Sequence, residues 1–318
     1  MLNRRTHHLI RSSKSLHTRM AVTRVCIVGS GYLGTQIGVL CARHGYDVSM
    51  HDISAEALKA SEEAVEGYLR GWMVEGDISE LEGDEIKERI SYTVNLAEAV
   101  HGAGIVVEAV VERLDVKREV FKKVDKLCDP TVLLATNSSS IRVSRIEDAT
   151  RHPGRLLNMH FYSYPWRRRV LELMRGSRTT DEAVEAAIVF SRSIDMCPLM
   201  VLRESTGFIF NRVWRAVKKE CLTVVDEGVA TFEDVDRAWM SLYGTDVGPF
   251  GLMDRVGLDV VRDIELVYYD ESGAPEDRPP KILLDRIERG DLGVKTGKGF
   301  YTYPDPDYRK PGWLHGGE

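Results

Sequence analysis

A histidine and a glutamate, twelve residues apart, are the first candidates for chemistry in this sequence. His160 follows the apolar run RLLNM, and Glu172 lies between two leucines in a second apolar run, VLEL. A carboxylate in an apolar strand is costly unless it has a partner, and two adjacent antiparallel strands would bring the pair together at the carboxyl end of a sheet. Glu172 would then orient the imidazole, and His160 could act as a general base near neutral pH. The alternative from these two residues alone is a structural histidine beside an edge-strand glutamate.

A glycine-rich segment near the start of the chain indicates a phosphate-binding turn. Gly29, Gly31 and Gly34 fit the pattern G-x-G-x-x-G, which is a weak signal by itself. Here the pattern follows the apolar run RVCIV and opens a predicted helix, and Asp52 ends a second predicted strand 23 residues after Gly29. This strand–turn–helix–strand context is the one that a dinucleotide-binding unit requires.

The residues of this segment have distinct expected roles. Gly29 makes the tight turn, Gly31 lets the backbone approach a pyrophosphate, and Gly34 lets the helix pack closely on the strand. Asp52 would accept hydrogen bonds from ribose hydroxyls, and no arginine follows it to hold a 2′-phosphate, so NAD is favoured over NADP. FAD uses the same pattern, and the motif alone leaves that alternative open. From this segment we assign to the cofactor site Gly29, Gly31, Tyr32, Leu33, Gly34 and Asp52.

The elements that must position these residues form two predicted domains. Up to about residue 205, apolar runs alternate with amphipathic segments, which is typical of a doubly wound (Rossmann-type) α/β domain. A helical excursion over residues 54–90 interrupts the sheet, which resumes with GIVVEAVV. After residue 205 only helical periodicity remains. We therefore expect a Rossmann-type domain over 21–205 and an all-helical domain over 206–318, bridged by a long helix that begins near Thr206.

Composition is that of a globular protein with room for two domains. The chain has 318 residues, of which 43% are hydrophobic and 29% charged. Its net charge of -6 gives no reason to expect nucleic acid or an anionic membrane as a partner, and no run approaches the ~18 apolar residues of a membrane span. Five cysteines without a C-x-x-C pair indicate reduced, packed thiols and no metal site.

The first 20 residues differ from the rest of the chain. They contain five basic residues and no acid, and they resemble a mitochondrial presequence. The alternative is that the natural chain starts at Met20 and that this leader is an extension without structural consequence. We expect a cytoplasmic protein, with the mitochondrial matrix as the alternative if the leader acts as a presequence.

As a set, the motifs of this chain resemble those of the L-3-hydroxyacyl-CoA dehydrogenase family. They comprise the glycine loop, VVEAVVERLDVK, TNSSS, MHFY, VLELM, TGFIFNR, GPFGLMDRVGLD and GVKTGKGFY, and the match runs from about residue 22 to Tyr303. The resemblance implies NAD-dependent, reversible oxidation of a 3-hydroxyacyl-CoA to a 3-oxoacyl-CoA. It also implies a homodimer and a place in fatty acid metabolism.

The resemblance also assigns roles to single residues. The family's His–Glu pair falls on His160 and Glu172, the oxygen-binding serine on Ser139, and the asparagine of the second domain on Asn211. His160 would take the 3-hydroxyl proton while carbon 3 delivers a hydride to the nicotinamide, and Ser139 and Asn211 would hold the reacting oxygen or the thioester carbonyl. Further cofactor contacts fall on Glu112, Lys117, Ser139 and Lys295.

Two departures from the family pattern concern the substrate. Ser163 stands where an asparagine is usual, and Trp166 and the three arginines 167–169 follow it; these either clamp an anionic group or form a solvated face. Residues 54–88 hold three basic residues against eleven acids, a poor surface for CoA phosphates. A free 3-hydroxy acid, such as carnitine or gulonate, is therefore the alternative substrate. A non-catalytic descendant of such an enzyme is the third hypothesis, against which the retained site residues argue.

Overall fold

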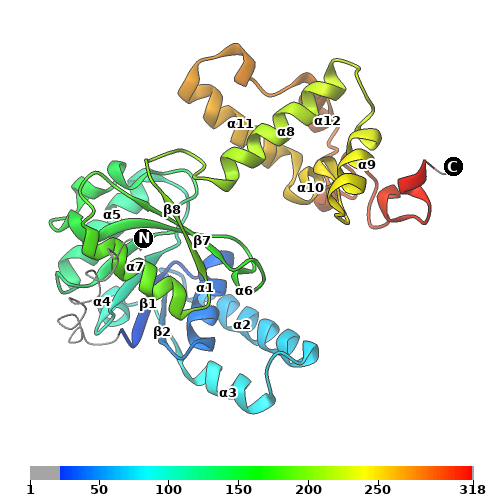
Figure 1. The fold of residues 1–318 in the computed structure, drawn as a ribbon. Coiled ribbons are helices and arrows are strands. Elements are labelled where there is room, and N and C mark those ends of the chain that lie inside the picture. The colour runs from blue at the N-terminus through cyan, green and yellow to red at the C-terminus, as the bar shows by residue number, and fades with distance from the viewer. Residues whose placement is uncertain (1–21, 317–318) are drawn as a thin grey trace, which may run out of the picture. The chain divides into compact units, whose positions relative to one another are not determined.

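The structure, a computed structural model, describes residues 22–316, so the predicted leader over residues 1–20 lies outside the described residues. The chain divides into two compact units after Phe208, whereas the boundary expected from the sequence lies after residue 205. The first unit carries an eight-stranded sheet and helices, and the described part of the second unit is built of helices (Figure 1). The predicted fold class, a Rossmann-type domain followed by an all-helical domain, is confirmed.

The first unit alternates strands and helices along the chain. Its strands are β1 (Arg24–Val28), β2 (Asp47–His51), β3 (Ile90–Thr93), β4 (Ile105–Glu108), β5 (Leu133–Thr136), β6 (Leu156–Phe161), β7 (Val170–Arg175) and β8 (Cys197–Val201). Its α-helices are α1 (Tyr32–Arg43), α2 (Ala55–Glu75), α3 (Glu80–Glu88), α4 (Leu96–Val100), α5 (Leu114–Leu127), α6 (Pro165–Arg168) and α7 (Asp181–Ser193).

The order of the strands places the candidate site at one edge of the sheet. The order is β3-β2-β1-β4-β5-β6-β7-β8, and neighbouring strands are parallel except for the antiparallel pair β6 and β7. The chain changes direction across the sheet between β1 and β4, and the carboxyl ends of two such strands are where doubly wound sheets bind ligands. The glycine loop follows β1 at this edge.

Successive residues of the strands enter two cores, one on each face of the sheet, because side chains alternate along a strand. Val25 and Ile27 of β1 join a core with residues of α1, α2 and α7. Cys26 and Val28 join the other core with residues of α4 and α5. Burial on both faces explains why the run VCIV, residues 25–28, is continuously apolar.

Two short elements depart from the expected order. The sequence predicts no strand between the helical excursion and GIVVEAVV, but β3 forms the edge of the sheet there and α4 follows it. Only Ile90 of the four β3 residues is buried. The strand therefore lacks the apolar run by which a central strand is identified, and its place is determined by pairing with β2.

The second unit contains five α-helices among its described residues. They are α8 (Phe210–Asp226), α9 (Phe232–Tyr243), α10 (Pro249–Val256), α11 (Leu258–Ser272) and α12 (Lys281–Glu288). The expectation of a bridging helix from Thr206 is wrong, because α8 begins at Phe210 and lies wholly inside this unit. Gly207 and Phe208 have φ values of 75° and 55°, which a right-handed helix does not accommodate.

The sequence also predicts reduced, packed cysteines and no membrane-spanning segment. All five cysteines are free, and Cys26, Cys41 and Cys221 are buried as expected, but Cys197 at the start of β8 is exposed, so the expectation of packed thiols is wrong for that residue. In the described part of the chain, no helix combines the length and apolarity needed to span a membrane.

Candidate active site

His160 and Glu172 form a buried pair across the β6–β7 ladder. They are direct partners in the antiparallel register, and Nδ1 of His160 lies 2.9 Å from Oε2 of Glu172. The two side chains are 6% and 0% exposed. Because an ionised carboxylate can only accept hydrogen bonds, Nδ1 carries the proton and Nε2 is left to accept one. The structure therefore brings the two predicted residues together in the geometry of an oriented base.

Tyr162 is a third member of this group that the sequence analysis missed. Its hydroxyl donates a hydrogen bond of 2.8 Å to Oε2 of Glu172, and its ring meets the His160 ring edge-on at a centroid distance of 4.6 Å. Burial, together with the hydrogen bond to Glu172 and its charge, raises the pKa of Tyr162, so the phenol stays a donor. Its place two residues after His160, where side chains of an extended chain return to the same face, is the signal that could have found it.

The loop between β1 and α1 makes contacts that only glycine permits. A Cβ on Gly34 would lie 2.0 Å from the carbonyl oxygen of Gly29, and one on Gly29 would lie 2.6 Å from that of Ala109. A Cβ on Gly31 would meet no heavy atom within 4 Å, so open space lies beside that residue. Helix α1 begins at Tyr32 without a side-chain hydrogen bond at its N-cap. This cradle fits a pyrophosphate at a helix N-terminus.

Asp52 holds the same loop from the end of β2. Its Oδ2 accepts hydrogen bonds from the Ser30 amide at 2.9 Å and the Ser30 hydroxyl at 3.2 Å, and its Oδ1 accepts from the Ser54 amide at 3.1 Å. A carboxylate has about four acceptor positions, so capacity remains for a ribose hydroxyl. Of the other two predicted residues, Tyr32 is exposed, and Leu33 is half-buried against the core.

A buried ion-pair network lies where β4 ends. The Lys117 ammonium is 2.7 Å from Oε1 of Glu108 and 3.2 Å from Oε2 of Glu112, and the Lys117 and Glu108 side chains are 1% and 0% exposed. Glu108 also accepts hydrogen bonds of 2.7 Å from the Thr136 hydroxyl and the Val110 amide. Lys117, which the resemblance assigns to the cofactor, is thus ion-paired with two carboxylates, and its partner Glu108 is not predicted from the sequence.

Glu112 connects this network to the serine turn after β5. Its Oε1 accepts hydrogen bonds from the Ser138 hydroxyl, the Ser140 hydroxyl at 2.8 Å and the Ser140 amide at 3.2 Å. Although burial acts to raise it, the charge of Lys117 and the serine hydrogen bonds hold the pKa of Glu112 below its usual value. Ser139, between the two bound serines, is exposed. The turn is therefore anchored on both sides of Ser139.

The serine turn lies beside the strand that carries His160. Strands β5 and β6 are parallel neighbours, and Oδ1 of Asn137 accepts a hydrogen bond of 2.8 Å from the Phe161 amide. His160 near the end of β6 and Ser139 in the turn after β5 are therefore both at the carboxyl edge of the sheet. The other predicted residues of the first unit, in the glycine loop and after β2 and β4, follow strands at this same edge.

Two predicted residues belong to the second unit. Asn211 is half-buried in the first turn of α8. Lys295 is ion-paired with Asp259, its ammonium lying 2.5 Å and 2.6 Å from the two carboxylate oxygens. The roles that the resemblance gives to both residues stay predictions.

The arginine cluster at α6 is paired within the first unit. Its contacts are Arg167 with Glu75 at 2.5 Å, Arg168 with the Ser163 hydroxyl at 3.2 Å, and Arg169 with Asp195 at 2.9 Å. Trp166 packs edge-on against Trp72 with ring centroids 4.9 Å apart. These contacts favour a solvated, charge-paired face over a clamp for an anionic substrate group.

Comparison with known protein families covers nearly all of the described chain. Residues 24–205 match the family model described as "3-hydroxyacyl-CoA dehydrogenase, NAD binding domain". Residues 207–303 match the one described as "3-hydroxyacyl-CoA dehydrogenase, C-terminal domain".

Individual proteins are similar over the same length. A probable 3-hydroxybutyryl-CoA dehydrogenase of Bacillus subtilis is 32% identical over 286 residues, which cover 90% of this chain and 99% of that protein. The mitochondrial hydroxyacyl-coenzyme A dehydrogenase of Homo sapiens is 30% identical, with 94% of this chain and 98% of that protein covered. The crystal structure of (S)-3-hydroxybutyryl-CoA dehydrogenase PaaH1 from Ralstonia eutropha has a TM-score of 0.84 at 30% identity, covering 90% of this chain and 100% of that one. The resemblance is confirmed: the chain belongs to the 3-hydroxyacyl-CoA dehydrogenase family and is an NAD-dependent oxidoreductase that acts on CH–OH groups.

Proposed function

We propose that the protein catalyses the reversible oxidation of the 3-hydroxyl group of a 3-hydroxyacyl-CoA to a 3-oxoacyl-CoA. The observation that carries this proposal is the 2.9 Å contact between His160 and Glu172 at the carboxyl edge of the sheet. When bound, NAD supplies the acceptor for the hydride that leaves carbon 3 of the substrate. The names of the Bacillus and human relatives support the CoA-linked substrate class, and this activity would serve fatty acid metabolism.

In this mechanism His160 is the general base. Its Nε2 takes the proton of the 3-hydroxyl group, and Glu172 stabilises the imidazolium that results. Tyr162 and His160 both contact Oε2 of Glu172, so the carboxylate and the imidazole are held in one fixed arrangement. In the reverse direction the imidazolium returns the proton. Ser139 would donate a hydrogen bond to the reacting oxygen, and Asn211 would hold that oxygen or the thioester carbonyl.

The cofactor contacts follow the arrangement of the loop and its neighbours. The α1 N-terminus with Gly31 would bind the pyrophosphate, and Asp52 the adenosine ribose. Glu112 and Lys117 would lie near the nicotinamide half of NAD. Glu112 accepts hydrogen bonds from the serine turn that contains Ser139, and Lys117 is ion-paired with Glu112. The complete proposed set of cofactor contacts is Gly29, Gly31, Tyr32, Leu33, Gly34, Asp52, Glu112, Lys117, Ser139 and Lys295.

One observation favours a second candidate substrate, a free 3-hydroxy acid of the carnitine or gulonate kind. Residues 54–88, which form α2 and α3, contain only three basic side chains, and all three are paired with acids of the same segment. The pairs are Lys59 with Glu63, Arg70 with Glu66, and Lys87 with Glu66. This surface therefore offers little attraction to the phosphates of CoA.

A spectrophotometric NADH assay separates the two substrates. We expect NADH oxidation with acetoacetyl-CoA and no comparable NADH formation with carnitine or gulonate; the reverse result would assign the free-acid activity. His160→Gln should lower turnover about 10²–10⁴-fold while the affinity for NAD stays within about twofold. His101→Gln, at an exposed turn position, is the matched control and should keep wild-type turnover. Unchanged turnover in His160→Gln would remove the catalytic assignment.

We also propose that the protein is a homodimer with two-fold symmetry. On α11, Val260, Ile264 and Val267 are 41%, 37% and 41% exposed. Their spacing of four and three residues places them on one helix face, so this helix has an apolar stripe to bury against a second copy. Light scattering should give twice the mass of one chain, and Ile264→Glu should give a monomer. A monomeric wild-type protein would exclude the dimer.

For the location we propose the cytoplasm, which the five free cysteines support. The alternative is the mitochondrial matrix, which the basic leader and the mitochondrial human relative support. Cell fractionation of the full chain, beside a chain that starts at Met20, tests the two. Mitochondrial recovery of the full chain alone would establish the leader as a presequence.

A further inference from the structure

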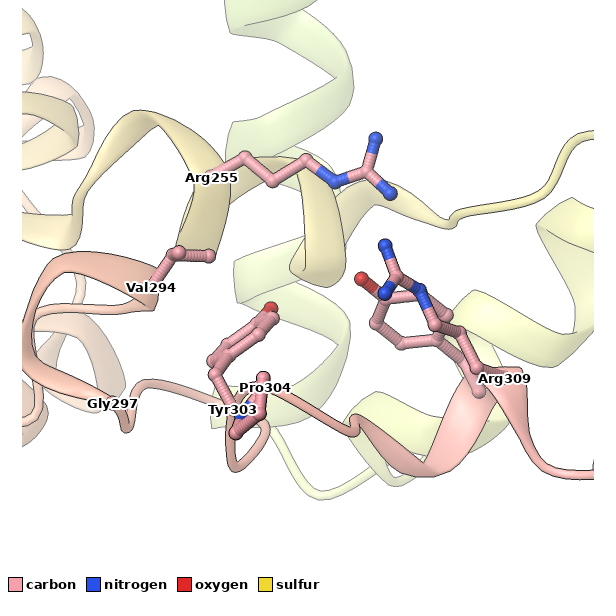
Figure 2. A pocket seen from close by; sticks show the side chains of 7 residues that line it. Arg255, Val294, Gly297, Tyr303, Pro304 and Arg309 are labelled. Carbon is pink, nitrogen blue, oxygen red and sulfur yellow. The ribbon is translucent and has the colours of Figure 1, made fainter.

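A cavity of about 460 Å³ lies in the second unit, between the end of α10 and the segment that follows α12. This volume is within the range of small-molecule sites. The cavity is lined by Arg255, Val294, Gly297, Tyr303, Pro304, Tyr308 and Arg309 (Figure 2). None of these residues has a part in the site proposed above.

Two arginines reach this cavity from different segments. Arg255 comes from the last turn of α10 and Arg309 from the C-terminal segment, and in Figure 2 their guanidinium groups point toward the same space beside Tyr303. Within residues 22–316, neither arginine forms an ion pair with a carboxylate. Both side chains are exposed, so solvent screens their mutual repulsion, but an anion between them is attracted by both guanidinium groups at low ionic strength. The arrangement therefore favours an anion between them.

Tyr308 adds a buried hydroxyl group to the wall of the cavity. Its side chain lines the cavity and is 5% exposed, and among the described residues its hydroxyl interacts with that of Tyr303 but makes no hydrogen bond of regular geometry. Buried hydroxyl groups in proteins are usually hydrogen-bonded. A ligand oxygen in the cavity would satisfy this hydroxyl.

The acids near the cavity do not neutralise the arginines. The carboxylate of Asp254 is 1% exposed and accepts hydrogen bonds from the Phe300 amide, the Tyr301 amide and the Tyr303 hydroxyl at 2.9, 2.9 and 3.1 Å. Asp307 is ion-paired with Lys310 at 2.5 Å. The positive charge of the two arginines is therefore available to a ligand.

We propose that this cavity binds a phosphorylated small molecule with an apolar or aromatic body. Planar guanidinium groups match phosphate oxygens in pairs, and two of them suit the nearly double charge of a phosphate monoester at neutral pH. The Tyr308 hydroxyl donates to a further oxygen. Val294, Tyr303 and Pro304 form the wall against which the body of the ligand packs.

Isothermal titration calorimetry on the full chain tests this site at low ionic strength, where screening is weak. NADH is kept at saturation so that the glycine loop is filled, and the probes are inorganic phosphate and adenosine 5′-monophosphate. Both should bind, the nucleotide more tightly. Arg255→Gln and Arg309→Gln should each weaken binding about tenfold or more. Arg289→Gln, at an exposed position of the same unit outside the cavity, is the matched control and should bind like the wild type.

Tyr308→Phe keeps the test decisive if an arginine variant folds poorly. It removes only a hydroxyl that makes no hydrogen bond of regular geometry within residues 22–316, so the thermal unfolding midpoint should change little, while binding of both probes should weaken by about threefold to tenfold. Absence of saturable binding at millimolar concentrations of both probes would overturn the proposal. Wild-type affinity in folded Arg255→Gln and Arg309→Gln, or in Tyr308→Phe, would overturn it as well.

Discussion

Replacing Lys117 by methionine measures what the buried ion pair contributes to the first unit. Methionine keeps an apolar stem of similar length and loses the charge, so the fully buried Glu108 carboxylate loses its partner at 2.7 Å. An uncompensated buried charge costs about 3–5 kcal/mol. Glu108 keeps its hydrogen bonds from Thr136 and Val110, which compensate part of the charge. We therefore expect the free energy of unfolding to fall by about 3 kcal/mol, the lower end of that range.

The double variant Glu108→Gln/Lys117→Met is the matched control. Glutamine still accepts a hydrogen bond from the Val110 amide and can donate one to the Thr136 hydroxyl, and no charge stays buried. It should regain about 2 kcal/mol of the loss, since removing both members of a buried pair is much less costly than removing one. Urea unfolding followed by circular dichroism gives both values. A single variant within about 0.5 kcal/mol of the wild type, or a double variant no more stable than the single one, would refute the reasoning.

The same two variants separate two roles of Lys117. If the ammonium binds the cofactor directly, as the family resemblance implies, the Kd of NAD rises in both variants. If Lys117 acts by holding Glu108 and Glu112, the double variant, in which Glu108 no longer needs a counter-ion, binds NAD better than the single one. Fluorescence titration with NADH distinguishes these outcomes.

Further predictions concern the base, the glycine loop and a buried aspartate. Tyr162→Phe removes a hydrogen bond to Glu172, so kcat should fall about tenfold with KM little changed; unchanged kcat in steady-state assays would contradict this. Gly34→Ala would set a Cβ 2.0 Å from a backbone oxygen and should lower the free energy of unfolding by about 1–3 kcal/mol. Gly31→Ala faces open space, so it should leave thermal unfolding unchanged and weaken NAD binding. A destabilised Gly31→Ala beside a stable Gly34→Ala would be inconsistent with this loop geometry. Although burial opposes the shift, hydrogen bonds from an arginine side chain and a backbone amide lower the pKa of Asp125 to about 2. Because the pKa of Asp125 is depressed in the folded state, its carboxylate stabilises the fold above about pH 4, and this effect is lost as the pH falls through 2. Asp125→Asn should therefore lower the free energy of urea unfolding by about 2 kcal/mol at pH 7 and by less at pH 3. An equal loss at both pH values would exclude this linkage.

Features that depend on near neighbours in the chain can be predicted from the amino-acid sequence alone. The spacing of Gly29, Gly31 and Gly34 between an apolar run and a helical pattern predicts the β1–α1 turn, because the turn is built from consecutive residues. The pair His160 and Glu172 was predictable because the segment between them is short enough for two adjacent antiparallel strands. The same local signals failed at β3, where only Ile90 is buried, and at the start of α8, where positive φ values delay the helix.

The partners of the buried polar groups, by contrast, follow from the packing of the folded chain. Lys117 lies nine residues from Glu108, and Glu112 lies 26 and 28 residues from Ser138 and Ser140. No pattern in the intervening residues predicts that these side chains form hydrogen bonds or ion pairs with each other. The same holds for the cavity between Arg255 and Arg309, whose positions are 54 apart in the chain. The physical reason is that packing brings distant segments together and removes water from them, and a polar group without water must then pair with whatever the fold has placed within hydrogen-bond reach.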